Sequence, residues 1–461
     1  MANFSSTPNQ QSFAASPIFV EGYTGQLSYE AGNEITFHIS SSVPEFSVEI
    51  ARIGAEREVV LTKSGLPGAE HPIPENAASY GCGWPVTFTE TVPKAWRSGY
   101  YSVTVSVEDH GGTYVQRGRR TATNELFFIV RSTEPGKDTS ILLQLATNTY
   151  NAYNNWGGYS LYEYNALNKT QAHRVSFDRP MIGQFGNWEK HFVEWAETNG
   201  YTLDFAANDD LEFRPELLEN YRLILSVGHD EYWSSPMRDH LEAFIASGGN
   251  VAFLSGNTCC WQIRCEDNGR AHTCYKQWFN HDPIYGDGDQ SLLATLWAHP
   301  LIGRPENELT GVGFRYGGYH LSHGQFMDGK GEFTVHQPGH WLFEGAGLKQ
   351  NDTFGAADTI GGYECDGCEF VIKDGVPVPT YQDGTPETFQ ILATCPSRWE
   401  PNEGNWFDEF DKDRIGAAML GIYEKGGTVV TSGTTDWAHG LRGNDPHVVQ
   451  ITKNVLDKLS R

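Results

Sequence analysis

Four residues whose side chains can transfer protons or bind metal ions follow one another at positions 229–232 of this 461-residue chain. They belong to the segment GHDEYW, residues 228–233, which comes directly after the apolar run at 223–227. Ligands of open α/β sheets collect beyond the carboxyl ends of the strands, so we predict a functional site here. The alternative is structural. Tyr232 and Trp233 would then pack in the core, while Asp230 or Ser234 caps a helix that starts near Pro236.

Amide and aromatic side chains are concentrated in a second segment, NTYNAYNNWGG at residues 148–158, after a predicted strand at 141–146. Buried groups of this kind need hydrogen-bond partners. One interpretation is a pocket wall that binds an amide or hydroxyl substrate through Tyr150, Asn151, Asn155 and Trp156. The other is a turn whose side chains bond to their own backbone. The sequence favours neither.

A third candidate is the histidine of the predicted helix WEKHFVEW, residues 188–195. Helical spacing places His191 on the same apolar face as Trp188, Phe192 and Trp195. A histidine on an apolar stripe is more often a core residue than a metal ligand.

The elements that position these residues fall into three predicted regions. Residues 1–16 are expected to be poorly ordered, and residues 17–132 alternate in short runs typical of an Ig-like β-sandwich. Residues 133–461 alternate strands with helices, as in the βαβ unit at 223–254, and carry a loop-rich insertion at about 260–385. This alternation predicts an α/β domain with a parallel sheet and helices on both faces.

The composition excludes several classes of function. With 33 basic and 58 acidic residues the net charge is −25, which disfavours nucleic acid and anionic membranes as partners. No signal sequence and no run of about 18 apolar residues is evident, so a cytoplasmic protein is expected. The eight cysteines are too sparse for a disulfide scaffold. The CxxC at 365–368 lacks a second ligand pair, which favours reduced thiols over structural zinc.

The motifs of familiar hydrolases and nucleotide-binding proteins are missing. The sequence contains no GxSxG, P-loop or HExxH motif, and no GxGxxG after a strand. Cys259 and Cys260 follow a predicted strand, so a metal-free, amidotransferase-like hydrolase with a cysteine nucleophile is a weaker alternative.

Six segments in order carry a resemblance to a known family: ATNTYNAYNNWGG from residue 146, WEKHFVEWAETNGYTLDF from 188, GHDEYWS from 228, the glycines and GN at 248–257, WLFEGAG from 341, and GTTDWAHGL from 433. Over about residues 140–460 the chain resembles the large (beta) subunit of N,N-dimethylformamidase, specifically its C-terminal catalytic region. The resemblance implies a flavodoxin-like fold related to class I glutamine amidotransferases. It also implies a mononuclear iron, held by two tyrosines and one glutamate, that hydrolyses a formamide.

Only some of the metal ligands that the resemblance implies can be matched to residues of this chain. Tyr232 matches one ligand tyrosine, whereas the helix expected to carry the other has Glu189 and His191 in its place. The acidic ligand is expected in the loop after the Trp261 segment, where we select Asp289 from several acidic residues. The implied metal ligands are therefore Tyr232, His191 and Asp289. Imidazole in place of a phenolate would make the site less anionic and suit ferrous iron or zinc.

From this we predict a hydrolase of a small neutral amide that uses a metal-activated water, with His229 or Glu231 as the proton shuttle. A homo-oligomer or an assembly with a small partner subunit is expected. The alternative function is a non-catalytic small-molecule or carbohydrate-binding protein, in which the aromatic loops at 150–164 form a stacking platform.

Overall fold

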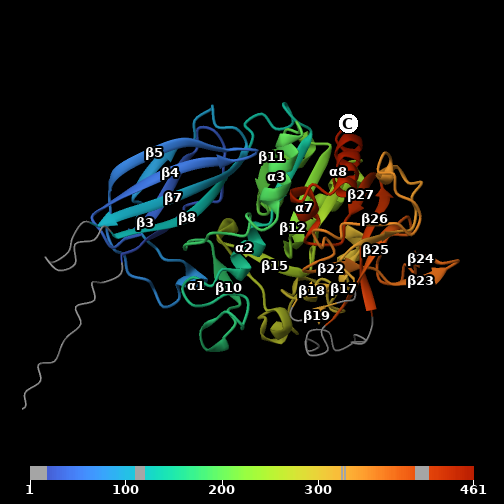
Figure 1. The fold of residues 1–461 in the computed structure, drawn as a ribbon. Coiled ribbons are helices and arrows are strands. Elements are labelled where there is room, and N and C mark those ends of the chain that lie inside the picture. Colours follow the sequence, from blue (N-terminus) through green and yellow to red (C-terminus); the bar gives the residue numbers. More distant parts are fainter. Residues whose placement is uncertain (1–17, 110–119, 323–324, 327–328, 400–414) are drawn as a thin grey trace, which may run out of the picture.

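The computed structural model describes residues 18–109, 120–322, 325–326, 329–399 and 415–461. The predicted poorly ordered segment, residues 1–16, lies outside them. Figure 1 shows a β-rich N-terminal part (blue) beside a larger part that contains most of the helices and the C-terminus.

The N-terminal part consists of a three-stranded sheet, in the order β1-β3-β6, and a five-stranded sheet, in the order β2-β8-β7-β4-β5. Their strands are β1 (Val20–Thr24), β2 (Ser28–Tyr29), β3 (Glu34–Ser41), β4 (Glu45–Ile53), β5 (Arg57–Pro67), β6 (Phe88–Thr91), β7 (Gly99–Asp109) and β8 (Arg120–Val130). Alternate residues of β4 and β7, such as Val48 and Val103, are buried in one core with Phe37 of β3. This is the period-two pattern of strands with one buried face. The domain boundary drawn near residue 132 stays a prediction.

A nine-stranded sheet forms the centre of the larger part, in the order β11-β9-β12-β14-β27-β26-β25-β20-β21. Its strands are β9 (Ile141–Leu145), β11 (Asp204–Ala207), β12 (Leu223–His229), β14 (Asn250–Gly256), β20 (Phe333–Val335), β21 (Thr353–Phe354), β25 (Gln390–Arg398), β26 (Ile415–Lys425) and β27 (Gly427–Thr431). β11, β9, β12, β14 and β27 pair in parallel, whereas β26, β25, β20 and β21 pair antiparallel.

The predicted flavodoxin-like, glutamine amidotransferase-like parallel sheet is therefore wrong. The chain is rich in strands, and they form mixed and antiparallel sheets with few helices. A physical reason lies in the connections. β26 and β27 are joined directly at Gly426, whose φ is +86°, so the chain reverses without a crossover helix. The segment expected as a loop-rich insertion holds several short strands.

Those strands form a four-stranded sheet, in the order β10-β16-β15-β13, and three two-stranded sheets. They are β10 (Arg174–Ser176), β13 (Tyr232–Ser234), β15 (Trp261–Glu266), β16 (Ala271–Thr273), β17 (Gly313–Gly318) with β22 (Cys365–Gly367), β18 (Leu321–Ser322) with β19 (Gln325–Phe326), and β23 (Phe370–Lys373) with β24 (Val376–Pro379). β10 and β13 belong to the four-stranded sheet, although both precede residue 260 in the sequence.

Helices lie on both faces of the nine-stranded sheet. The described helices are α1 (Ala77–Tyr80), α2 (Thr147–Tyr153), α3 (Glu189–Thr198), α4 (Asp210–Phe213), α5 (Ser235–Ala246), α6 (Asn307–Thr310), α7 (Trp437–Arg442) and α8 (Pro446–Leu459). Of these, α3, α7 and α8 lie on one face of the sheet, and α4 and α5 lie on the other. On β12, Leu225 faces the core shared with α3, α7 and α8, whereas Ile224 faces the core shared with α4 and α5. Ser234 caps α5 by accepting a hydrogen bond from the amide of Met237.

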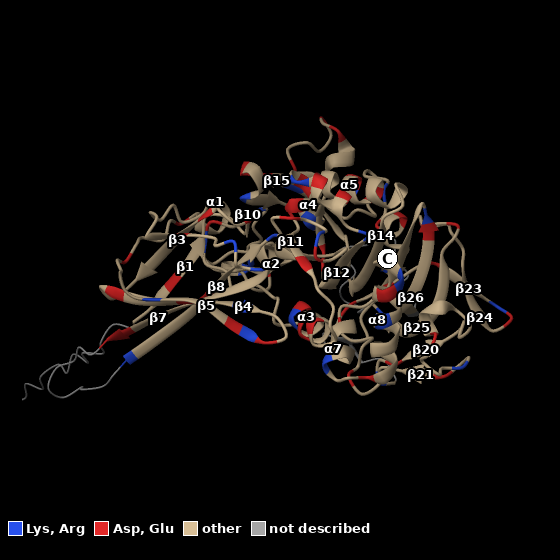
Figure 2. Ribbon diagram, turned by 90° about the horizontal axis from the view of Figure 1, so that it is seen from above, with Lys and Arg blue, Asp and Glu red and all other residues tan. Residues whose placement is uncertain are grey.

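The two parts are joined by buried polar and aromatic contacts. Arg52 of β4 forms an ion pair with Glu197 of α3 at 2.6 Å, and the ring of Tyr100 stacks on Phe185 at 3.9 Å. Figure 2 shows acidic residues spread over both parts rather than gathered in one patch. No helix among the described residues has the length and apolar character needed to cross a membrane.

Candidate active site

The site is built where β12 ends at His229, as the sequence pattern predicts for a strand terminus. Gly228 precedes it with φ +83°, and a Cβ there would lie 2.4 Å from the Cβ of Trp188, so only glycine fits. Asp230 turns away and accepts hydrogen bonds from Ser226 at 2.8 Å and Asn208 at 3.2 Å. Asp230 therefore anchors the turn that presents its neighbours.

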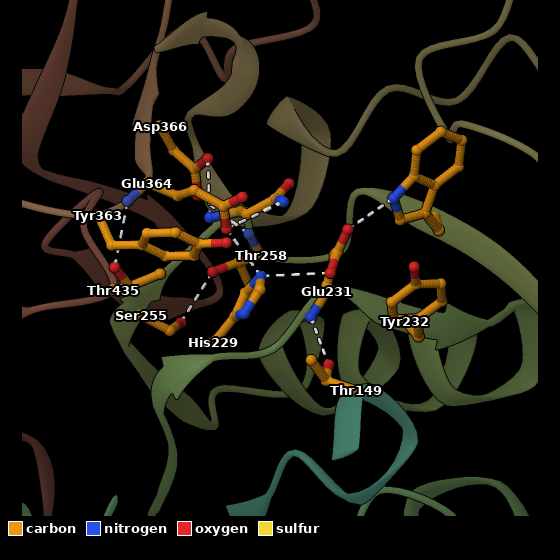
Figure 3. Close-up of polar contacts among 12 residues, drawn as sticks. Thr149, His229, Glu231, Tyr232, Ser255, Thr258, Tyr363, Glu364, Asp366 and Thr435 are labelled. Carbon is orange, nitrogen blue, oxygen red and sulfur yellow. Dashed lines mark hydrogen bonds and ion pairs between the residues drawn. The ribbon is translucent and has the colours of Figure 1, made fainter. Parts of the chain in front are cut away.

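His229 lies between two carboxylates (Figure 3). Its Nε2 atom is 2.8 Å from Oε2 of Glu364 and 3.2 Å from Oε2 of Glu231. Both contacts are ion pairs, because the N–H of Nε2 does not point at either carboxylate closely enough for a hydrogen bond. Burial lowers the pKa of His229, but the two carboxylates outweigh burial and raise it to about 10. The imidazole is therefore protonated at neutral pH.

Glu364 reaches His229 from the segment just before β22. Nδ2 of Asn257, in the turn after β14, donates to Oε2 of Glu364 at 3.3 Å. Asp366 holds that turn by accepting the amides of Asn257 at 3.0 Å and Thr258 at 3.1 Å. Segments distant in sequence thus meet at this point.

Besides His229, Glu231 is held by one acceptor of its amide and by two donors to its carboxylate. Its amide donates to Oγ1 of Thr149 at 2.9 Å, and its carboxylate accepts Tyr162 at 2.9 Å from both oxygens and Trp261 at 2.7 Å. Burial would raise the pKa of Glu231, but His229 and then Lys276 lower it below its ordinary value. Glu231 is therefore an ionised carboxylate in a buried site.

Phenol groups surround this carboxylate. The hydroxyl of Tyr232 donates to that of Tyr162 at 2.7 Å, and the rings of Tyr153 and Tyr162 lie 4.2 Å apart. Burial and then the charge of Glu231 raise the pKa of all three tyrosines well above the ordinary value. The phenols are therefore neutral unless a further cation is bound.

A buried lysine completes the cluster. Nζ of Lys276 donates to Oη of Tyr232 at 3.0 Å and lies 3.3 Å from the centre of the Tyr162 ring. Burial lowers its pKa to about 8, against the opposing charge of Glu231. Lys276 also has a φ of +54°, a strained conformation of the kind that clusters at functional sites.

These groups border a cavity of about 130 Å³. Its lining is mostly aromatic with a few polar groups, as is usual for small-molecule sites. The lining residues are Tyr153, Tyr162, Tyr164, Glu231, Asn257, Cys260, Trp261, Lys276, Phe314, Tyr319, Tyr363, Glu364 and Trp399. The volume is close to that of a protein cavity that holds one benzene molecule, roughly 150 Å³. The cavity thus suits a ligand of a few heavy atoms.

The four residues predicted to bind substrate do not line this cavity. Tyr150 donates to Glu189, and Asn155 donates to the carbonyl of Asn165 at 3.0 Å. Asn151 and Trp156 also have internal partners: Oδ1 of Asn151 accepts from Arg179 at 3.2 Å, and Nε1 of Trp156 donates to Glu21 at 2.8 Å. From this part of the chain, the structure places Tyr153, Tyr162 and Tyr164 at the cavity instead.

The three predicted metal ligands are not brought together. Tyr232 is buried against Tyr162 and Lys276, whereas Asp289 is exposed and caps a turn by accepting the amide of Ser291 at 3.0 Å.

Nε2 of the third predicted ligand, His191, lies 3.4 Å from Nη1 of Arg442, and burial and then Arg442 lower the pKa of His191 to about 4. Among the described residues, no group of three or more His, Cys, Asp or Glu side chains is arranged to hold a metal ion.

A site of two tyrosines and one glutamate can still be assembled from other residues. Tyr153, Tyr162 and Glu231 line the same cavity, and Tyr162 touches both Glu231 oxygens. In donor type this set fits a mononuclear iron, because a bound cation would offset the unfavourable charge on buried phenolates.

Sequence reasoning did not single out Tyr153, Tyr162, Lys276 or Glu364, although both tyrosines lie in the aromatic loops at 150–164 that the alternative function uses. Tyr153 was within reach, because it belongs to the segment singled out at 148–158. Lys276 and Glu364 carry no local signal, since they lie far from residue 231 in a part of the chain without clear periodicity.

Comparison with known proteins places this chain in a family. The model of the N,N-dimethylformamidase beta subunit-like, C-terminal family matches residues 47–450. The N,N-dimethylformamidase beta subunit of Alcaligenes sp is 24% identical over 439 residues, which cover 82% of this chain and 54% of that protein. The subunit of the same name from Paracoccus aminophilus is 25% identical over 214 residues, 40% of this chain and 28% of that protein. The chain thus spans about half the length of the relatives it matches, or less. These matches confirm the resemblance predicted from the sequence: the chain belongs to the N,N-dimethylformamidase beta subunit-like, C-terminal family.

Proposed function

We propose that this protein hydrolyses the C–N bond of a small neutral amide at the cavity beside Glu231. The observation that carries the proposal is the contact of one ionised carboxylate with both His229 and Tyr162 at the wall of a cavity of about 130 Å³. Relatives named as beta subunits of N,N-dimethylformamidase support the same reaction class.

The charges around the cavity favour a neutral substrate. Glu231 and Glu364 are offset by the protonated His229 and by Lys276, so the polar end of the cavity has little net charge. The cavity is also lined by Phe314, whose ring centre lies 4.3 Å from that of Trp399 and 5.4 Å from that of Tyr319. Aromatic faces of this kind pack well against N-alkyl groups and exclude water.

The protein's own groups can hold and move the protons that hydrolysis requires. Nε2 of His229 contacts Glu231 and Glu364, and both carboxylates line the cavity, so the proton of His229 can pass to a leaving nitrogen through one of them while the other stabilises the imidazolium. Nζ of Lys276 supplies a positive charge in a dry environment where a carbonyl oxygen becomes negative.

For a bound iron, Tyr153, Tyr162 and Glu231 are the residues that would hold it. When bound, such an ion supplies Lewis-acid polarisation of the amide carbonyl and acidifies water. Since the relatives are named beta subunits, we also propose that the chain works in an assembly with a partner subunit.

The test is hydrolysis of a graded set of amides by purified, iron-loaded protein, with amine release as the readout. Formamide, N,N-dimethylformamide and a bulkier N-phenyl amide would be compared, with and without a chelator. We expect turnover of the small amides, loss on chelation and little turnover of the N-phenyl compound. A folded, iron-loaded protein that releases no amine contradicts the proposal, and glycan binding that survives chelation would favour the stacking-platform alternative.

A further inference from the structure

Arg179 is a fully buried arginine that lies beside the tyrosine-bearing segment rather than in the cavity. Its side chain is 0% exposed. Within the described part of the chain no carboxylate forms an ion pair with it. Burial lowers the pKa of Arg179 to about 9. Desolvating a guanidinium without a counter-ion is costly, so its other contacts must offset that cost.

Those contacts are five oxygens, of which four come from residues 151–159 and one from Ser176. Nη1 donates to the carbonyls of Trp156 at 2.6 Å and Tyr159 at 3.1 Å, and Nη2 donates to the carbonyl and side-chain oxygens of Asn151 at 3.4 and 3.2 Å. Nε donates to the carbonyl of Ser176 at 2.9 Å. The planar guanidinium has five N–H donors in a fixed fork, whereas a lysine has one nitrogen and cannot span these oxygens.

The gathered oxygens flank the tyrosines of the site. Asn151 lies two residues before Tyr153 near the end of α2, where a cation is favourable to the helix dipole. Tyr159 lies three residues before Tyr162, whose hydroxyl contacts Glu231 at 2.9 Å. One side chain therefore ties the end of α2 to the loop that follows it.

We propose that Arg179 is a positioning residue that fixes Tyr153 and Tyr162 against Glu231. We call the contacts of Arg179 with residues 151–159 the clamp. The expected effect on turnover rests on the proposed function, whereas the ordering of the loop by the clamp does not. The same loop is also held from the N-terminal part, because Nε1 of Trp156 donates to Glu21 at 2.8 Å and its ring lies 5.7 Å from that of Trp84. A variant of Arg179 should therefore loosen the loop without unfolding the protein.

The experiment compares Arg179→Lys and Arg179→Met with a matched control, Arg238→Lys, in the full chain. Arg238 is equally buried and also donates to two carbonyls, those of Arg304 and Pro305. However, it lies on α5, pairs with Glu242 at 2.7 Å and, in the described part of the chain, forms no hydrogen bond or ion pair with the tyrosine loop. The first readout is amide hydrogen exchange of residues 151–162. The second is kcat and KM for a small amide.

We expect exchange in residues 151–162 to rise about tenfold or more in both Arg179 variants, and only there, because the loop opens locally. kcat should fall by about 100-fold with KM changed much less, since the reacting groups are misplaced. Arg238→Lys should change neither.

Unchanged exchange in residues 151–162 of a folded Arg179→Lys protein would overturn the clamp, as would an equal rise in Arg238→Lys. Raised exchange in a protein whose wild type hydrolyses no amide would leave the clamp standing and refute the proposed function alone.

Discussion

Glu306 should make the protein less stable as the pH rises from 5 to 8. The side chain is 3% exposed, and its Oε2 atom has no hydrogen-bond partner. Burial raises its pKa from 4.5 to about 7, against smaller opposing effects of backbone amides and Arg238. The folded state therefore binds this proton more tightly than the unfolded chain. The stabilising effect is complete below pH 4.5 and is lost as the pH rises through 7.

The gap between 4.5 and about 7 is worth about 3 kcal/mol, and most of it falls between pH 5 and pH 8. Glu306→Gln keeps the shape of the side chain but cannot become charged. Between pH 5 and pH 8 the free energy of unfolding of the wild type should fall by about 2 to 3 kcal/mol more than that of Glu306→Gln. The matched control is Glu308→Gln, whose side chain is 42% exposed.

Urea unfolding followed by tryptophan fluorescence at the two pH values measures this difference. Glu306→Gln and wild type with the same pH dependence would refute the reasoning, because the buried carboxyl would then not be the titrating group.

Three further predictions concern the site and the contact between the two parts. Tyr162→Phe removes the hydroxyl that donates to Glu231 and should lower kcat about 100-fold in a protein that unfolds at the wild-type temperature; unchanged kcat would contradict this. Arg52→Met breaks a buried ion pair with Glu197 and should destabilise the protein by about 3 kcal/mol in urea unfolding, whereas a loss near zero would mean that the pair is not needed. Cys260→Ser should keep activity within about threefold of wild type, because burial raises the pKa of the thiol well above its ordinary value and leaves it inert. Abolished turnover in Cys260→Ser would revive a cysteine nucleophile.

The features that were predicted correctly are those that depend on residues close together in the sequence. The strand ending at His229, the cap at Ser234 and the helix after it all follow from an apolar run, a capping residue and helical spacing. The family also followed from short segments in a fixed order, and the matching family model confirms it.

The sheet could not be predicted in the same way, because its pairing is set by contacts between distant segments. β16, β20 and β21 have three residues or fewer, too short to show a period. Residues from about 260 to 385 were therefore predicted to be loop-rich, and the antiparallel pairing of the central sheet was missed.

In the site too, residues with a local sequence signal were predicted and residues brought in by long-range contacts were not. His229 and Glu231 were identified from their place after a strand, and the structure brings them together. Glu364 reaches them only through long-range folding, and its contact with His229 at 2.8 Å has no sequence signature. Asp289 was selected from a loop without any contact information, and the structure places it at the surface.

The central claim is that Glu231 is the carboxylate at which a small amide is hydrolysed. Its most direct test is amine release from N,N-dimethylformamide by iron-loaded wild type, Glu231→Gln and the surface control Glu194→Gln. We predict that Glu231→Gln lowers kcat by about 1,000-fold or more, with bound iron reduced, while Glu194→Gln matches wild type. A folded Glu231→Gln protein with wild-type turnover would contradict the claim.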